Sequence, residues 1–156
     1  MRRARNYKRE VKEDPIHGHK LVTKLINRAM FDGKRSVAQK QVYTAFAQIA
    51  KEGEPLGLFL KAIENIKPSM EVRPRRIGGA AYQVPSPVRG VRKESLAIRW
   101  LIQGANARSN SQYKTFANKL AAEILDASKG EGQAIHKKQE VEKSAEANKA
   151  FSHFRW

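Results

Sequence analysis

The sequence has no cysteine and no long run of apolar residues. The lack of cysteine excludes disulfides, zinc ribbons, iron–sulfur clusters and thiol nucleophiles. The longest segment without a charged residue is the 12 residues between Arg76 and Arg89, and its two prolines make it unfit to span a membrane. No apolar segment follows the basic N-terminus, so no secretory signal is visible and we expect a cytoplasmic protein without a membrane partner.

Acidic residues are also few: 15 Asp and Glu stand against 31 Lys and Arg, which gives a net charge of +16 over 156 residues. The length predicts one domain, and a hydrophobic content of 40% is enough for a core. Residues 1–12 and 67–93 together carry +11 of the excess charge. The pattern predicts a near-neutral helical body with two cationic projections. Nucleic acid is the leading candidate partner, because release of counterions from a polyanion favours binding of such cationic segments. An anionic lipid surface is the alternative partner.

Apolar residues recur at helical spacing in six segments, at about 18–31, 36–51, 55–66, 92–108, 114–128 and 133–148. Gly33 is expected to supply a left-handed stop after the first helix. Ser36 with Gln39 predicts a capping box at the second helix, and Pro55 predicts the first turn of the third. A polar stretch at 109–112 is expected to end the fourth helix and separate it from the fifth. The fold predicted is mainly α, a single domain of about six helices.

A different pattern occupies residues 72–85. Gly78-Gly79 lies between two short runs, which is typical of a two-residue hairpin turn. Pairing Ile77 with Ala80 sets Arg75 opposite Tyr82 and Arg73 opposite Val84, with Arg76 on the other face. Arginine on both faces, with three prolines, predicts a two-stranded β-ribbon at about 72–88 that protrudes between the third and fourth helices.

These segments divide the chain into a flexible basic arm at 1–14, a helical body at 15–148 that carries the ribbon, and an aromatic and basic tail at 149–156. Trp100 falls in a helical stripe and is expected in the core. Tyr82 either stacks on a base or packs on the body. Phe151, Phe154 and Trp156 need cover from the body or from a partner.

Catalytic and metal-binding patterns are missing. His17 and His19 are two residues apart, which suits no zinc spacing, and the acidic residues form no pair typical of a metal-dependent nuclease. A phosphate-binding loop that ends at Lys34 would need glycine at position 28 and a strand before it. Position 28 is Arg28 and a helix is expected before the loop, so this motif is rejected. We therefore expect no enzymatic activity, no cofactor, no metal and no small-molecule substrate.

Five blocks of residues resemble the bacterial form of the small-subunit ribosomal protein seven family. Arg75-Arg76-Ile77-Gly78-Gly79-Ala80, with Tyr82-Gln83-Val84-Pro85, looks like the hairpin of that family. Four other blocks match in order: residues 20–27 with 32–34, residues 62–68, Arg99-Trp100, and residues 145–151 with His153 and Arg155-Trp156. The resemblance covers about residues 15–156.

The resemblance implies six helices with a protruding ribbon, in agreement with the periodicity. It also implies a structural constituent of the small ribosomal subunit. Such a protein binds the 3′ major domain of 16S ribosomal RNA as a primary binder and nucleates assembly of the subunit head. It lies beside the exit-site tRNA and the messenger path, and it contacts small-subunit ribosomal proteins nine and eleven.

The residues expected to bind RNA lie in the arm, the first helix and the loop after it, the ribbon, and the start of the fourth helix. They are Arg2, Arg3, Arg5, Lys8, Arg9, Lys20, Lys24, Lys34, Arg35, Arg73, Arg75, Arg76, Tyr82, Arg92 and Lys93. The tail residues expected near tRNA or a partner protein are Phe151, His153, Arg155 and Trp156.

Three segments depart from the family pattern. The arm matches only as a basic segment, the loop at 109–113 is less basic than usual, and Lys143-Ser144 stands where His-Met is common. The alternative function is a non-specific architectural protein for nucleic acid. A membrane-surface module is disfavoured because the helices lack an aromatic and leucine face opposite a lysine-rich one.

Overall fold

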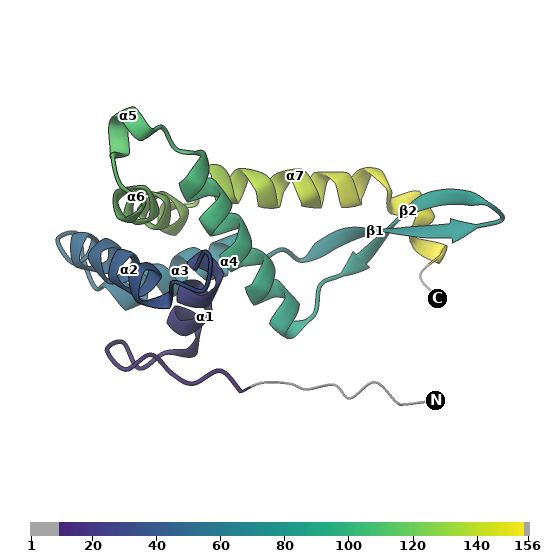
Figure 1. Cartoon of the computed structure of the whole chain (residues 1–156). Coiled ribbons are helices and arrows are strands. Elements are labelled where there is room, and N and C mark those ends of the chain that lie inside the picture. The colour runs from purple at the N-terminus through teal and green to yellow at the C-terminus, as the bar shows by residue number, and fades with distance from the viewer. Residues whose placement is uncertain (1–9, 155–156) are drawn as a thin grey trace.

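A computed structural model gives the fold and describes residues 10–154. The predicted contacts of Arg2, Arg3, Arg5, Lys8, Arg9, Arg155 and Trp156 lie outside the described residues. The elements in chain order are α1 (Lys20–Ala29), α2 (Arg35–Ile49), α3 (Pro55–Ile66), β1 (Met70–Ile77), β2 (Ala80–Pro87), α4 (Gly90–Ala107), α5 (Asn110–Tyr113), α6 (Phe116–Lys129), α7 (Gln133–Ala147) and the 3₁₀ helix η1 (Lys149–Phe154). The predicted mainly helical fold, with a ribbon between the third and fourth helices, is confirmed (Figure 1).

The helix starts follow the sequence only in part. Pro55 opens the first turn of α3, as predicted. The capping box predicted at Ser36 is wrong, because α2 already begins at Arg35 and its N-cap makes no side-chain hydrogen bond. The turn before α2 explains the shift. Asp32 and Gly33 both take positive φ, at 50° and 72°, and this tight reversal starts the helix one residue early.

The polar stretch that separates the fourth and fifth predicted helices contains a short helix of its own. Ser109 caps α5, since its hydroxyl accepts a hydrogen bond from the N–H of Ser111 at 3.3 Å. A second unpredicted helix, η1, follows α7 within the predicted tail. Both are too short to leave a helical period in the sequence.

The core lies among α1, α2, α3, α4 and α6, and α6 packs against α2, α3 and α4. Phe46 of α2 and Phe59 of α3 are fully enclosed, with ring centroids 5.5 Å apart. Burial of each ring contributes about 1.5–3 kcal/mol. Trp100 is buried in α4, so its predicted place in the core is confirmed.

The ribbon leaves this body between α3 and α4 and extends well beyond it (Figure 1). Its register confirms the predicted pairs: Ile77 with Ala80, Arg75 with Tyr82, and Arg73 with Val84. The turn residues Gly78 and Gly79 have φ of 56° and 89°, a conformation that side chains with a Cβ rarely adopt. Helix α7 contacts β1 and η1 contacts β2, and η1 reaches Tyr82 opposite Arg75, so the C-terminal segments brace the ribbon from its base outward.

Candidate nucleic-acid interface

The outer part of the ribbon presents two arginines. Arg75 and Arg76 are neighbours on β1, just before the turn, and both are exposed. Neither has an ion pair or a hydrogen bond from its side chain to another residue described by the structure. Their side chains leave opposite faces of the strand, as the pairing with Tyr82 and Ala81 requires. The ribbon can therefore offer a guanidinium fork to phosphates on either side.

The base of the ribbon holds its arginines differently. The carboxylate of Glu71 on β1 is nearly buried, with 8% of its side chain exposed. Arg73 Nε donates to Glu71 Oε1 at 2.7 Å, and Arg92 Nε of α4 donates to both carboxylate oxygens at 2.8 Å. Burial alone would raise the pKa of Glu71, but the hydrogen bonds from Arg92 and Arg73 outweigh it, so its pKa lies below the ordinary value.

This arrangement, which we call the Glu71 clamp (Glu71, Arg73 and Arg92), ties the ribbon to the start of α4. Its three side chains carry a net charge of +1, and both arginine side chains remain about half exposed. Two residues predicted to bind RNA thus also set the position of the ribbon. Glu71 itself was not predicted from the sequence. Glu71 and Arg73 are two residues apart in a predicted strand, so the sequence indicates that they share a face and can pair. Nothing in the sequence places Arg92 beside them.

Tyr82 packs on its own chain. Its ring lies 5.4 Å from the ring of Phe151 and 5.4 Å from that of Phe154, centroid to centroid. These two tail residues thus find cover on β2, and they draw η1 against the ribbon. His153 is exposed beside them, with its Nδ1 2.9 Å from the carbonyl oxygen of Ala150.

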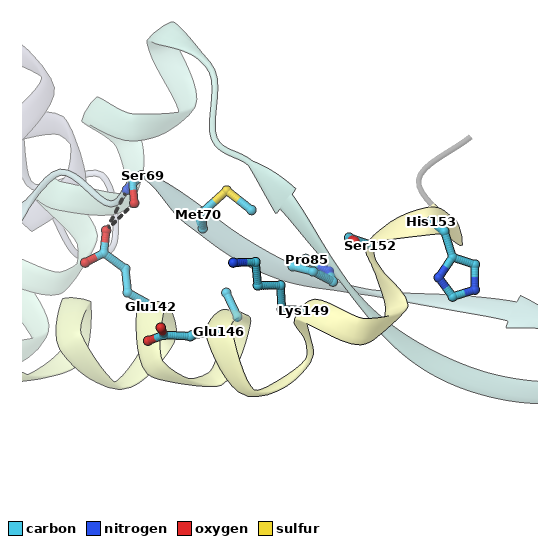
Figure 2. Close-up of a pocket in the computed structure, with 9 residues that line it drawn as sticks. Ser69, Met70, Pro85, Glu142, Glu146, Lys149, Ser152 and His153 are labelled. Atoms are coloured by element: carbon cyan, nitrogen blue, oxygen red, sulfur yellow. Dashed lines mark hydrogen bonds between the residues drawn. The ribbon is translucent and has the colours of Figure 1, made fainter.

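A cavity of about 670 Å³ lies between the base of the ribbon, the end of α7 and η1 (Figure 2). Glu142 closes its inner end, because it accepts hydrogen bonds from the N–H and the hydroxyl of Ser69 at 2.8 and 2.7 Å. Burial would raise the pKa of Glu142, but the two bonds from Ser69 outweigh it and lower that pKa. Lys149 and His153 line the opposite side, so the cavity offers groups of both signs.

The remaining predicted residues are spread over α1, the turn after it, and α4. Lys24 of α1 forms an ion pair with Glu94 of α4 at 2.5 Å, which joins the two helices. Lys20 lies 4.0 Å from Glu13, at the outer limit for an ion pair. Lys34 is exposed and 3.8 Å from Asp32, Arg35 is exposed, and Lys93 is half-buried. Lys24, through Glu94, and Lys93, next to Arg92, thus lie at the same first turns of α4 as the clamp arginine. The other three residues lie on α1, in the turn after it and at the start of α2.

One more charged cluster lies inside the body, and we call it the Arg108 cluster (Arg108, Glu123 and Asp126). Arg108 Nε donates to the fully buried Glu123 at 2.7 Å, and its terminal nitrogen donates to Asp126 at 2.5 Å. Glu123 also accepts the N–H of Ala134 at 2.8 Å, which joins α6 to the first turn of α7. Burial would lower the pKa of Arg108, but its bonds to both carboxylates raise that pKa further above the ordinary value.

The histidines have structural contacts. His19 caps α1, since its Nδ1 accepts the N–H of Leu21 at 3.1 Å. The ring of His17 packs against Phe46, with centroids 4.8 Å apart. Across residues 10–154, no three His, Asp or Glu side chains come together as a metal site would require. None of the helices described there has both the length and the apolar character needed to cross a membrane.

Comparison with known proteins agrees with this picture. A model of the family described as "Ribosomal protein S7p/S5e" matches residues 1–149. Proteins named "Small ribosomal subunit protein uS7" are similar to the chain. That of Sulfurimonas denitrificans is 51% identical over the whole of both chains, and that of Thermotoga maritima is 50% identical over the whole of both. That of Carboxydothermus hydrogenoformans is 53% identical over 96% of this chain and 95% of its own. The chain belongs to the ribosomal protein S7p/S5e family.

Proposed function

We propose that the chain is a structural constituent of the small ribosomal subunit that binds the 3′ major domain of 16S ribosomal RNA directly and nucleates assembly of the subunit head. Membership of the family supports this role. The observation that carries it is the braced, projecting ribbon, whose exposed Arg75 and Arg76 have no acidic partner among the described residues. The net charge of +16 supplies the wider attraction to RNA.

The proposal extends to neighbours in the ribosome. The ribbon and the tail would lie beside the exit-site tRNA and the messenger path, and small-subunit ribosomal proteins nine and eleven would contact the chain. Phe151 and His153 belong to this tail surface. The protein would act in the cytoplasm as a binding protein without catalysis, cofactor, metal or small-molecule substrate.

The geometry suggests how binding occurs. Phosphate contacts from the arginines release counterions, which supplies affinity but carries no sequence information. Selectivity then depends on holding those arginines at fixed positions relative to a folded RNA surface, because structured RNA is recognised largely by shape. The Glu71 clamp and the packing of η1 on Tyr82 both fix the ribbon, so they support recognition of a shaped site.

The test is a filter-binding titration at two salt concentrations, with the 3′ major domain and a length-matched unrelated structured RNA as ligands. We expect a preference of about a hundredfold or more for the ribosomal fragment, a lower threshold than the roughly thousandfold or greater preference typical of specific protein–DNA sites. Contacts to about seven phosphates give a log–log salt slope of roughly −6. Equal affinities that fall together with salt would instead support the non-specific architectural protein.

The double substitution Arg75→Ala and Arg76→Ala tests the ribbon within the same titration. We expect weaker binding to the ribosomal fragment and a salt slope smaller by about 2. Lys51→Ala with Lys61→Ala is the matched control, because it removes the same charge from exposed positions on the helical body. An unchanged affinity in the ribbon variant would show that the ribbon arginines do not contribute to RNA binding.

A further inference from the structure

An apolar cleft opens at the turn between α1 and α2, on the body and away from the ribbon. Its volume is about 260 Å³, and Phe31, Val37 and Phe116 form much of its lining, with Lys34, Gln41 and Asn106 also on the wall. Phe31 is 72% exposed and Val37 is 57% exposed, which places both among the most exposed large hydrophobic residues described. Exposed apolar side chains that gather at one cleft are typical of a binding site.

The exposure of Phe31 is built into the fold. The turn that carries it is closed by hydrogen bonds from Lys34 N–H to Phe31 O at 2.9 Å and from Arg35 N–H to Gly33 O at 2.8 Å. The positive φ of Asp32 and Gly33 fixes the reversal between the two helices. No other aromatic ring of the described residues packs against Phe31. The chain thus fixes the backbone position of Phe31 while leaving its ring largely in solvent.

The segment that carries the ring is cationic. Lys34 lines the cleft beside Phe31, and Arg28 in the last turn of α1 and Arg35 at the start of α2 are exposed in the same segment. The one acidic group in the turn, Asp32, lies 3.8 Å from Lys34 and offsets only part of this charge. An apolar ring beside several cations complements a nucleotide, whose base has an apolar face and whose phosphate is an anion.

We propose that this cleft receives one unpaired nucleobase of the bound RNA, stacked on the ring of Phe31, while Lys34 holds an adjacent phosphate. The inference rests on the proposed function and adds to it a site for a single-stranded nucleotide. The cleft is smaller than the roughly 300–1,000 Å³ of a site for a drug-sized ligand, which suits a single ring system.

Polar groups at the wall can read the edge of the base. Gln41 Oε1 accepts the N–H of Ala117 at 3.2 Å, and this bond fixes the amide so that its NH₂ group is left to donate. Asn106 is exposed at the end of α4 and offers both a donor and an acceptor. The cations favour RNA over an apolar side chain of a partner protein as the occupant.

The test compares substitutions of Phe31 in the titration against the 3′ major domain. Phe31→Leu keeps the apolar character but removes the ring, so we expect about tenfold weaker binding with an unchanged salt slope. Phe31→Tyr keeps the ring and is expected to bind as the original chain does. Lys34→Gln is expected to lower the salt slope by about 1 instead. Ile16→Ala is the control for loss of another exposed apolar side chain, and it should have no effect.

A second readout reports stacking directly. In Phe31→Trp, stacking of a base on the indole should quench its fluorescence when the RNA fragment is added, and the original chain, which contains Trp100 and Trp156, provides the baseline to subtract. The melting temperature of each variant should match that of the original chain, because the substituted side chain is exposed. If the original chain prefers the 3′ major domain but Phe31→Leu binds it with full affinity, this inference is overturned alone, and the cleft is left to a protein partner. If the original chain shows no preference for the 3′ major domain, the proposed function is overturned, and this inference with it.

Discussion

The Arg108 cluster and the Glu71 clamp use the same groups in opposite proportions. Inside the body, one guanidinium lies between two carboxylates, and Glu123 is completely buried. At the base of the ribbon, one buried carboxylate lies between two guanidinium groups whose side chains are half exposed. The body cluster therefore has a net charge of −1 around the fully buried Glu123, with Asp126 partly exposed at its edge, and the ribbon clamp has a net charge of +1 at the surface.

The difference separates two uses of an ion pair. In the Arg108 cluster the interactions are satisfied within the protein, and they join α4, α6 and α7. In the Glu71 clamp a single carboxylate fixes two arginines but cannot neutralise both, so positive charge remains for a phosphate. A count of charges along the sequence cannot make this distinction, because both clusters contribute arginines to the same total.

The largest effect is expected from Arg108→Leu. Removal of the guanidinium leaves Glu123 buried without a cation, and loss of one partner from a buried pair costs about 3–5 kcal/mol. Urea unfolding should show a decrease of this size in the free energy of unfolding. Arg99→Leu, at an exposed position of the same helix, is the control and should change stability by less than about 0.5 kcal/mol. A loss of less than about 1 kcal/mol in Arg108→Leu would show that the buried Glu123 does not depend on the Arg108 guanidinium.

A smaller effect on stability, but a larger one on RNA selectivity, is expected from Glu71→Gln. The amide keeps an acceptor oxygen but loses the charge-assisted bonds to Arg73 and Arg92, at a cost of about 1–2 kcal/mol. We expect about tenfold less preference for the 3′ major domain over the unrelated RNA, or roughly 1.4 kcal/mol. Affinity for the unrelated RNA should rise slightly, because a negative charge is gone.

The matched control for that experiment is Glu64→Gln. It makes the same charge change at an exposed carboxylate in the last turn of α3 that pairs with Lys67, outside the Glu71 clamp. It should leave selectivity unchanged. If both variants alter binding equally, only charge matters, and the clamp does not position the ribbon for recognition.

Much of the fold follows from local signals in the sequence. Gly78-Gly79 predicts the turn, and the turn sets the register of every pair along the ribbon, which is why the pairing of Arg75 with Tyr82 could be predicted. Pro55 predicts the start of α3 for a similarly local reason. The capping signal at Ser36 failed because the preceding turn, with two residues at positive φ, determines where α2 begins.

The candidate site depends on contacts that local signals do not carry. Glu71 and Arg92 are 21 residues apart and meet only because the ribbon returns to the start of α4. The packing of Phe151 on Tyr82 needs the length and direction of α7, which brings the tail back to the ribbon (Figure 1). The exposure of Phe31 likewise depends on how α1 and α2 meet. An apolar residue next to a helix end can be either buried or exposed, and the local sequence does not decide which.

The smallest effect is expected when the clamp is protonated. The pKa of Glu71 in the folded protein is lower than in the unfolded chain, so its contribution to stability is present above about pH 4.5 and is lost as the pH falls through the lowered pKa. NMR signals of the Nε–H groups of Arg73 and Arg92 should shift together at that lowered pKa, because both groups donate to the same carboxylate. In Glu71→Gln this common transition should be absent. A midpoint at or above pH 4.5 would mean that burial, rather than the two guanidinium groups, dominates at this carboxylate, and the contrast with the Arg108 cluster would then be much weaker.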